Sequence, residues 1–210
     1  MYDEIQVLAH SSIRISKGLT LYFDPFHVKE ETHDADIICV THDHFDHYSP
    51  EDIAKIKNDS TVLICPKSME ASLANSGISE EFIELVEAGD ELEINDVKIE
   101  IVAAYNVGKD FHPQKKHWVG YIAVIDGVRY YVAGDTDINE DVEAVKCDVA
   151  LLPVGGTYTM TAEEAAKLAV TLAPAMAIPT HYGDIVGTKD DADRFIKLLE
   201  GKVKACIKMQ

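Results

Sequence analysis

Short apolar runs bounded by polar residues predict several strands in the first third of the chain. Each run is rich in isoleucine, valine, leucine or phenylalanine and ends at turn-forming or charged residues. Runs of this length fit a strand and are too short for a typical helix. The sequence therefore predicts strands at residues 5–9, 13–16, 19–23, 37–40 and 61–65.

In the middle of the chain, two turn-forming pairs each separate two further strand-like runs. Asparagine, aspartate and glycine tolerate the left-handed backbone that a two-residue hairpin needs, so both segments are predicted hairpins. The turns are Asn95-Asp96, between residues 91–94 and 97–103, and Asp126-Gly127, between residues 119–125 and 128–132.

Helix-start signals lie between the strands. Ser49 with Pro50 combines a capping hydroxyl with proline in the first turn, and Thr161 with Glu164 forms a capping box. Hairpins followed by strand–helix alternation predict two sheets with helices outside, in a single domain over residues 1–210. The remaining expected elements are helices at residues 66–76, near Glu140 and at 191–199, and strands at 149–152, 175–178 and 203–207.

The composition is that of an ordinary globular protein, with 47% hydrophobic and 27% charged residues. No apolar run approaches the roughly 20 residues that span a bilayer, and the N-terminus does not have the pattern of a signal peptide. The formal net charge of −18 disfavours nucleic acid as a partner. Because Cys39, Cys65, Cys147 and Cys206 are far apart, we expect reduced, mostly buried thiols and a cytoplasmic protein.

Residues 41–47 contain three histidines and two aspartates directly behind an apolar run. His42 and His44 alternate on one side of an extended loop, and Asp46 and His47 turn toward a second position. Imidazole nitrogens and carboxylate oxygens are ligands that zinc, manganese and iron accept. Histidine-rich surface loops without function exist, but four such groups at this spacing favour a metal site.

Three later segments place more candidate ligands beside predicted strands. His112 and His117 precede a strand, whereas Asp135 and His181 each follow one. Loops at the rim of a rigid sheet commonly carry such groups. Asp135 alone could be a turn carboxylate and His181 an ordinary loop histidine. Their order behind the first motif favours one shared site.

In that order of motifs the chain resembles the metallo-β-lactamase-fold proteins over essentially its whole length. Its start resembles the branch that contains bacterial ascorbate-6-phosphate lactonase and N-acyl-phosphatidylethanolamine phospholipase D. In that branch a His-Ser/Ala-Ser segment and an Asp-Pro-Phe segment precede the metal motif, and here these are residues 10–12 and 24–26. The resemblance implies an α/β fold, a four-layer αββα sandwich of two mixed sheets flanked by helices, with the metal site along one edge.

The resemblance also implies two metal ions. One would bind His42, His44 and a third histidine, the other Asp46, His47 and His181, and Asp135 would bridge them. Zinc is the expected metal, with Mn²⁺ or Fe²⁺ as alternatives.

The third histidine departs from the His-Thr-x-Gly-His pattern that is common in the family. We favour His112, which lies 23 positions before Asp135 (135 − 112). Pro113 is expected to hold His112 in an extended backbone, whereas His117 is expected to begin a strand. His117 and Asn106 are the alternatives.

A centre of this kind activates water, so we expect a hydrolase of a small ester, lactone or phosphoester. Asp46 could orient the water and pass a proton to the leaving group. His10 and Tyr105 are the other candidate catalytic residues, and Asp24 could orient a ligand histidine. Candidates for substrate contact are Thr157, Tyr158 and Tyr182.

Two alternatives remain open at this point: an iron-dependent oxidoreductase on the same fold, and a metal-binding protein without catalysis. Oxygen-reducing members replace one histidine by a carboxylate and carry a flavin domain, whereas this chain keeps His44. The expected partner is a small molecule, and the oligomeric state stays open. Lys109, Lys115 and Lys116 could bind the phosphate of a phosphorylated sugar lactone.

Overall fold

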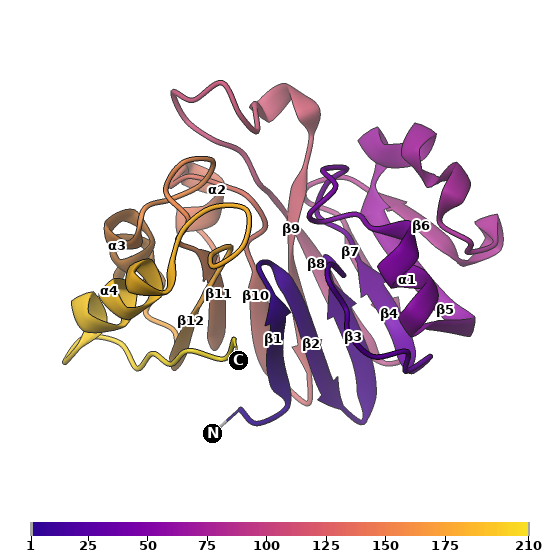
Figure 1. Ribbon diagram of the computed structural model, residues 1–210, viewed down its shortest axis with the longest axis horizontal. Coiled ribbons are helices and arrows are strands. Elements are labelled where there is room, and N and C mark those ends of the chain that lie inside the picture. The colour runs from indigo at the N-terminus through magenta and orange to yellow at the C-terminus, as the bar shows by residue number, and fades with distance from the viewer. Residues whose placement is uncertain (1, 210) are drawn as a thin grey trace. The chain divides into compact units, whose positions relative to one another are not determined.

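The computed structural model describes residues 2–209, apart from the side chain of Asn75, and these residues form two compact units. The N-terminal unit ends at Val86, and the C-terminal unit is Glu87–Lys208. Each unit is built on one six-stranded mixed sheet with helices beside it (Figure 1). The expectation of a single domain over residues 1–210 stays a prediction.

The sheet of the N-terminal unit follows the chain order from β1 to β6. The first three strands are antiparallel, and β3 to β6 are parallel. β1, β3 and β4 therefore run in one direction, so the loops behind them leave the sheet at the same edge. The strands are β1 (Ile5–Ala9), β2 (Ser12–Lys17), β3 (Leu19–Phe23), β4 (Ala35–Cys39), β5 (Lys57–Pro66) and β6 (Ile83–Val86).

The sheet of the C-terminal unit has the order β12-β11-β10-β9-β8-β7. β7 to β10 are antiparallel, and β10 to β12 are parallel. β8, β10, β11 and β12 consequently end at one edge. The strands are β7 (Glu91–Ile94), β8 (Val97–Ala103), β9 (Val119–Ile125), β10 (Val128–Val132), β11 (Val149–Pro153) and β12 (Met176–Thr180).

Both predicted hairpins are confirmed, because each expected turn pair joins two paired strands. Asn95, Asp96 and Asp126 all have positive φ angles, as does Gly127, which is the left-handed backbone that such turns require.

The helices begin where the capping signals predicted. Ser49 accepts a hydrogen bond from the Asp52 N–H at the start of α1, and the Thr161 capping box starts α3. None of the helices within residues 2–209 is long and apolar enough to cross a membrane. The helices are α1 (Pro50–Ile56), α2 (Glu140–Glu143), α3 (Ala162–Leu172) and α4 (Lys189–Leu199), with 3₁₀ turns η1 (Lys67–Asn75), η2 (Glu80–Phe82) and η3 (Gln114–Lys116).

Each unit buries its own apolar face. In the N-terminal unit, Ile53 and Ile56 of α1 pack in one cluster with Ile38 of β4 and Leu63 of β5. In the C-terminal unit, α3 and α4 lie side by side next to β11 and β12 (Figure 1). This burial supplies the main stabilisation of both sheets.

The strand expected at residues 203–207 is wrong. Ala205 forms one isolated parallel bridge with Ala177 of β12, made by the Ala177 N–H to the Lys204 carbonyl and the Cys206 N–H to the Ala177 carbonyl. The next hydrogen bond of a parallel ladder would need an N–H from Pro179, which has none. The pairing therefore ends after one residue.

The helix expected at residues 66–76 forms as the 3₁₀ helix η1. Its N-cap is Pro66, and no side chain caps the first turn. The N–H groups at that end consequently lack the acceptor that starts α1 and α3, which disfavours a regular α-helix.

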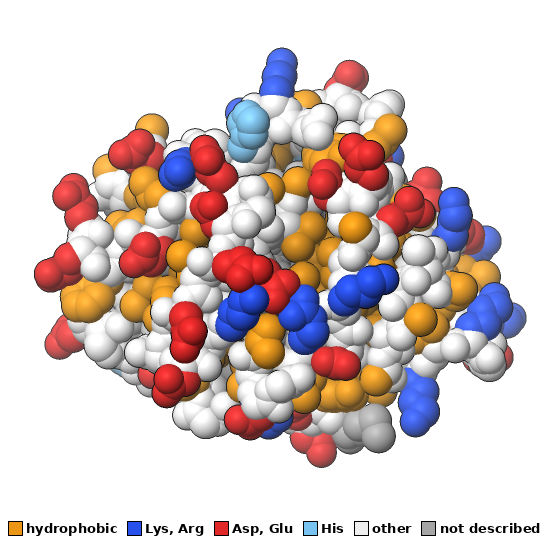
Figure 2. Space-filling model, turned by 180° about the vertical axis from the view of Figure 1, so that it is seen from behind, with side chains coloured by type: hydrophobic (Ala, Val, Ile, Leu, Met, Phe, Trp, Pro, Cys, Tyr) orange, Lys and Arg blue, Asp and Glu red, His pale blue; other side chains and the backbone are white. Residues whose placement is uncertain are grey.

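Acidic side chains are scattered over the surface among lysines and arginines, and no large basic patch gathers on the face that Figure 2 shows. This agrees with the net charge of −18.

Asp52 fixes the loop behind β3 to helix α1. Its buried carboxylate accepts hydrogen bonds from the His27 and Val28 N–H groups at 2.9 and 3.1 Å and from Lys55 Nζ at 2.7 Å. We expect Asp52→Ala to lower the free energy of unfolding by about 2–3 kcal/mol, because two N–H groups lose a charged acceptor. The neighbouring Glu51→Ala, with a side chain 87% exposed, should change it by less than about 0.5 kcal/mol. Urea unfolding of both variants tests this, and equal stabilities would contradict it.

Candidate metal centre

The N-terminal unit gathers its candidate ligands at the carboxyl edge of its sheet. His10 follows β1, Asp24 follows β3, and residues 41–47 follow β4. His10, His42, Asp46 and His47 are buried, and His44 is half-buried. The parallel direction of these strands is what brings residues from three loops together.

Asp24 organises this half of the centre. One carboxylate oxygen accepts the Thr41 N–H at 2.7 Å, and the other accepts the Thr41 hydroxyl at 2.7 Å. The second oxygen also lies 2.7 Å from His47 Nδ1. A ring that donates its Nδ1–H carries its lone pair on Nε2, so Asp24 fixes His47 in the tautomer that can bind a metal through Nε2.

Thr41 extends this arrangement to His42. The Thr41 hydroxyl donates to Asp24, so its oxygen accepts from His42 Nδ1 at 2.9 Å. The lone pair of His42 is then on Nε2, which lies 3.1 Å from His44 Nδ1. Two nitrogens that bind one tetrahedral zinc at about 2.0–2.1 Å lie about 3.3 Å apart. The His42–His44 pair therefore fits a shared ion.

Asp46 lies between two other histidines of this unit. Its Oδ2 is 3.4 Å from His10 Nε2 and 3.6 Å from His47 Nε2. A buried carboxylate beside imidazoles is stabilised by a proton or a cation shared among them. The donor set of the N-terminal unit, nitrogen and carboxylate oxygen at ligand-to-ligand spacing, thus fits a divalent metal ion.

The C-terminal unit gathers a second set around Asp135. Asp135 Oδ2 lies 3.2 Å from His112 Nε2 and 3.0 Å from His181 Nε2. All three side chains are buried. One carboxylate oxygen between two imidazole nitrogens, again close to the spacing of atoms that share a metal, also fits a cation.

Of the two histidines that are candidates for the third ligand, His112 is buried, whereas His117 is exposed at the end of η3. His112 Nδ1 lies 3.1 Å from the Tyr158 carbonyl, which can only accept. An Nδ1–H donated to this carbonyl leaves the lone pair of His112 on Nε2, facing Asp135, and Asn106 Nδ2 lies 3.3 Å from the same Nδ1. Asn106, the other alternative, donates from Nδ2 to the same carbonyl at 2.6 Å and so supports the loop of His112.

The backbone of His112 is not extended as Pro113 suggested. His112 has φ +52, in the left-handed region. Its carbonyl accepts the Asn106 N–H at 2.8 Å, which closes the loop of residues 106–112. His117 is equally not in a strand, because it caps η3 with φ +54 and β9 begins at Val119.

Left-handed backbone recurs at the candidate site. His10, Asp24, His112 and His181 all have φ between +46 and +56. A residue with a side chain in this region costs roughly 1–3 kcal/mol and persists where the surroundings fix it, commonly at functional sites.

Gly155, at the end of β11, leaves room for His181. A Cβ on Gly155 would lie 2.6 Å from the His181 carbonyl oxygen and 3.0 Å from His181 Nδ1. Any side chain there would displace the histidine. The sequence shows this glycine but not the close approach that requires it.

The hydroxyl of Tyr105 makes a hydrogen bond with another side chain of the fold. This hydroxyl donates to Asp141 at 3.0 Å, and burial, followed by Asp141, raises the pKa of Tyr105 to about 12. The catalytic role expected for Tyr105 stays a prediction. Lys109, expected as a phosphate ligand, binds Asp137 Oδ1 at 2.5 Å and the Thr159 carbonyl at 2.7 Å.

The four cysteines are free, and burial raises the pKa of Cys65 to about 12 and that of Cys39 well above its usual value. Buried protonated thiols are poor ligands and nucleophiles. The expected reading of Cys39 and Cys65 as small buried hydrophobic residues is confirmed.

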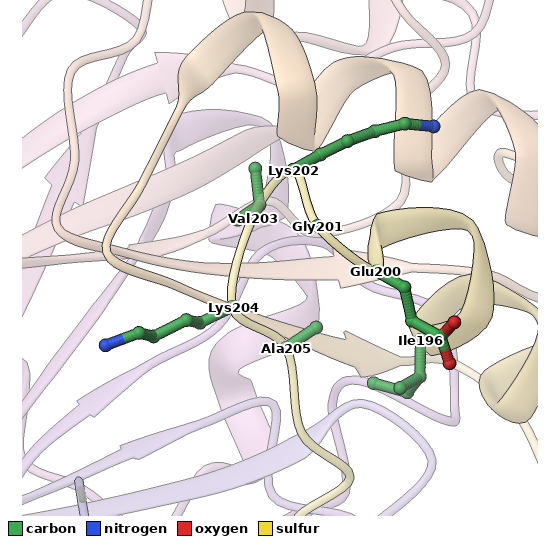
Figure 3. A pocket seen from close by; sticks show the side chains of 7 residues that line it. All are labelled: Ile196, Glu200, Gly201, Lys202, Val203, Lys204 and Ala205. Atoms are coloured by element: carbon green, nitrogen blue, oxygen red, sulfur yellow. The ribbon is translucent and has the colours of Figure 1, made fainter.

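A cavity of about 320 Å³ lies at the end of α4, away from any predicted ligand. Figure 3 shows Lys202 and Lys204 extending in opposite directions and Glu200 beside Ile196. Its charged groups do not converge on a point, as the polar groups of a catalytic pocket do.

Comparison with known proteins identifies a matching family and similar sequences. A family model described as the beta-lactamase superfamily domain matches residues 4–181. A UPF0173 metal-dependent hydrolase of Thermococcus onnurineus is 30% identical, over 97% of this chain and 95% of its own length.

Two solved structures have the same fold. A protein of Parabacteroides distasonis described as a metal-dependent hydrolase shares 29% identity, with a TM-score of 0.81 over 98% of this chain and 93% of its own. A Thermotoga maritima protein described as a Zn-dependent hydrolase of the metallo-β-lactamase superfamily shares 22% identity, with a TM-score of 0.65 over 98% and 97%. The expected α/β fold of two mixed sheets flanked by helices is confirmed, and the expected branch within the superfamily stays a prediction. The chain thus belongs to the metallo-β-lactamase superfamily, together with the UPF0173 metal-dependent hydrolases.

Proposed function

We propose that this chain is a metal-dependent hydrolase of a small ester, lactone or phosphoester. The observation that carries the proposal is the set of buried imidazoles held at Nδ1. Asp24 holds His47, Thr41 holds His42, and the Tyr158 carbonyl holds His112. Each contact directs the lone pair to Nε2, which is the arrangement of metal-binding histidines.

We propose His42, His44 and His112 as ligands of one ion and Asp46, His47 and His181 as ligands of a second, with Asp135 between them. The assignment to one binuclear centre rests on the family resemblance. The position of Asp135 Oδ2 within 3.2 Å of both His112 and His181 supports a bridging role. Zinc is our first choice because nitrogen-rich sites of this size suit it, and Mn²⁺ or Fe²⁺ are alternatives.

A bound divalent ion would lower the pKa of its water toward about 7, so that hydroxide forms near neutral pH. Asp46 would accept the proton of the attacking water and pass it to the leaving group. His10, with Nε2 3.4 Å from Asp46 Oδ2, would hold that carboxylate in place. The free thiols support the expected reducing, cytoplasmic setting.

The function is tested by metal analysis of the purified protein together with a panel of esters, lactones and phosphoesters. We expect bound metal and hydrolysis of at least one class, abolished by a chelator and restored by zinc or manganese. Bound iron with oxygen consumption would instead support the oxidoreductase alternative. Tight metal without turnover of any substrate would support a non-catalytic protein.

The role of Asp24 predicts a loss of metal affinity without loss of a ligand. We expect Asp24→Asn to weaken zinc binding about 10–100-fold, because an amide can no longer hold both the Thr41 hydroxyl and His47 as the carboxylate does. Asp43→Asn, in the loop of residues 41–47 but exposed, is the matched control and should bind zinc like the wild type. Competition with a chelator measures both affinities. Equal affinity of the two variants would contradict the role of Asp24.

Because His112 is buried and His117 is exposed, we predict that His112 is the third histidine ligand of the first ion. Titration of zinc into metal-free protein should show that His112→Ala loses or sharply weakens one of two binding events, while His117→Ala changes affinity little. The reverse result would assign His117. Two intact events in both variants would remove both histidines from the centre.

The position of Asp135 predicts that Asp135→Ala lowers metal occupancy more than His181→Ala does. A bridging carboxylate serves two ions, whereas one histidine serves one. Metal-to-protein ratios of both variants after equal dialysis provide the measurement. The same ratio in both would argue against a bridge.

A further inference from the structure

Exposed apolar side chains concentrate on the loops that carry the proposed ligands. Among the described residues, five large hydrophobic side chains are exposed. Four of them lie in the loops of residues 41–47, 105–112 and 181–187, and one lies on α3. They are Phe45, Val107, Phe111 and Ile185 on the loops, and Val170 on the helix. Exposed apolar groups gathered around a polar site mark a place where a partner or ligand is bound.

In the C-terminal unit, Val107, Phe111 and Tyr158 form what we call the apolar rim. Phe111 directly precedes His112, and its ring meets the Tyr158 ring edge-to-face at 4.7 Å and 80°. The Tyr158 carbonyl is the acceptor of His112 Nδ1. The two rings are therefore attached, through neighbouring residues, to the backbone that orients a proposed ligand.

The loop that presents the rim is held firmly. The Asn106 N–H bonds the His112 carbonyl at 2.8 Å, and the Val107 N–H bonds Asp137 Oδ2 at 3.1 Å. Lys109 adds its contacts to Asp137 and the Thr159 carbonyl. Phe111 is thus held 47% exposed by a tied loop, and a fixed apolar surface binds ligand at low entropic cost.

Two lysines near the rim already have partners, and the overall charge of the chain disfavours an anionic substrate. The Lys109 ammonium is neutralised by Asp137, and Lys116 lies over the Trp118 ring at 5.5 Å. The chain as a whole carries a net charge of −18, which repels phosphate.

In the N-terminal unit, an exposed aromatic ring also lies beside the proposed ligands. Phe45, between His44 and Asp46, is 65% exposed and meets the Phe26 ring edge-to-face at 6.1 Å. Each unit therefore presents an exposed aromatic ring next to its proposed ligands.

From these observations we propose that the apolar rim selects substrates with a neutral alkyl or aryl group beside the bond that is hydrolysed, in preference to phosphorylated substrates. This inference rests on the proposed function and narrows its substrate class. Phe111 supplies the larger share of the contact, because it is the most exposed ring of the rim and its partner Tyr158 is half-buried.

The kinetic test uses one reactive group with a growing apolar chain: 4-nitrophenyl acetate, butyrate and hexanoate, with the zinc-loaded enzyme. We expect kcat/KM to rise about twofold per added methylene, since full burial of a methylene corresponds to about fourfold and an open rim covers roughly half of it. Phe111→Ala should flatten this rise. Val170→Ala, an exposed apolar change outside the ligand loops, should keep it.

A binding test separates failure of this inference from failure of the proposed function. Trp118 is the single tryptophan, and its ring lies 5.3 Å from the His112 ring, so its fluorescence reports on this loop. We expect 4-phenyl-1-butanol to change the emission saturably, with at least fivefold weaker binding in Phe111→Ala and unchanged binding in Val170→Ala. Glycerol 3-phosphate should give no saturable change.

Two results would overturn the inference. One is tighter binding of glycerol 3-phosphate than of phenylbutanol to the wild type. The other is equal phenylbutanol binding by wild type and Phe111→Ala. If no ester is hydrolysed by any form of the protein, hydrolysis of this class fails, and the fluorescence titration still decides the role of the rim.

Discussion

The interaction on which the N-terminal half of the proposed centre depends is the Asp24 carboxylate at the end of β3. It binds the Thr41 N–H, the Thr41 hydroxyl and His47 Nδ1, each at 2.7 Å. These three contacts join the loops behind two neighbouring parallel strands and fix the tautomer of a histidine. The carboxylate is buried, so it is stabilised only while these donors remain in place. Burial of this carboxylate is therefore stable only while the ligand loop keeps its ordered conformation.

The C-terminal unit reaches the same result by other means. A backbone carbonyl, that of Tyr158, takes the place of a carboxylate and holds His112, while Gly155 leaves room for His181. A carbonyl accepts and cannot donate, so the ring nitrogen that faces Asp135 is the one with the lone pair. In both units, the groups that bind the imidazole Nδ1 orient the ring so that its Nε2 can bind a metal.

The same loops that orient the histidines also present apolar rings to solvent. Asn106 donates to the carbonyl that His112 also contacts, and Lys109, in the same loop, is paired with Asp137. One set of hydrogen bonds thus serves two ends: it fixes a proposed ligand, and it leaves Phe111 as the exposed neighbour of that ligand. In the proposed function, the same loop would therefore contribute both to the orientation of a metal ligand and to contact with the substrate.

The sequence by itself determined the local features that depend on neighbouring residues. Hairpin turns at Asn95-Asp96 and Asp126-Gly127, and the caps at Ser49 and Thr161, follow from side chains within a few positions, as does the density of ligands in residues 41–47. The ligand motif of residues 41–47, with the order of the later candidate ligands, also carried the resemblance to the superfamily that the comparisons confirm.

What only the tertiary structure decided are contacts between residues distant in the chain. Pro179 limits Ala205 to one bridge, the Asn106 N–H bonds the His112 carbonyl, and Asp24 meets His47. Burial separated His112 from His117, which local sequence could not do. The physical reason is that pairing, burial and tautomer depend on which loops share a sheet edge, and that is set by strand order and direction, not by the residues adjacent in sequence.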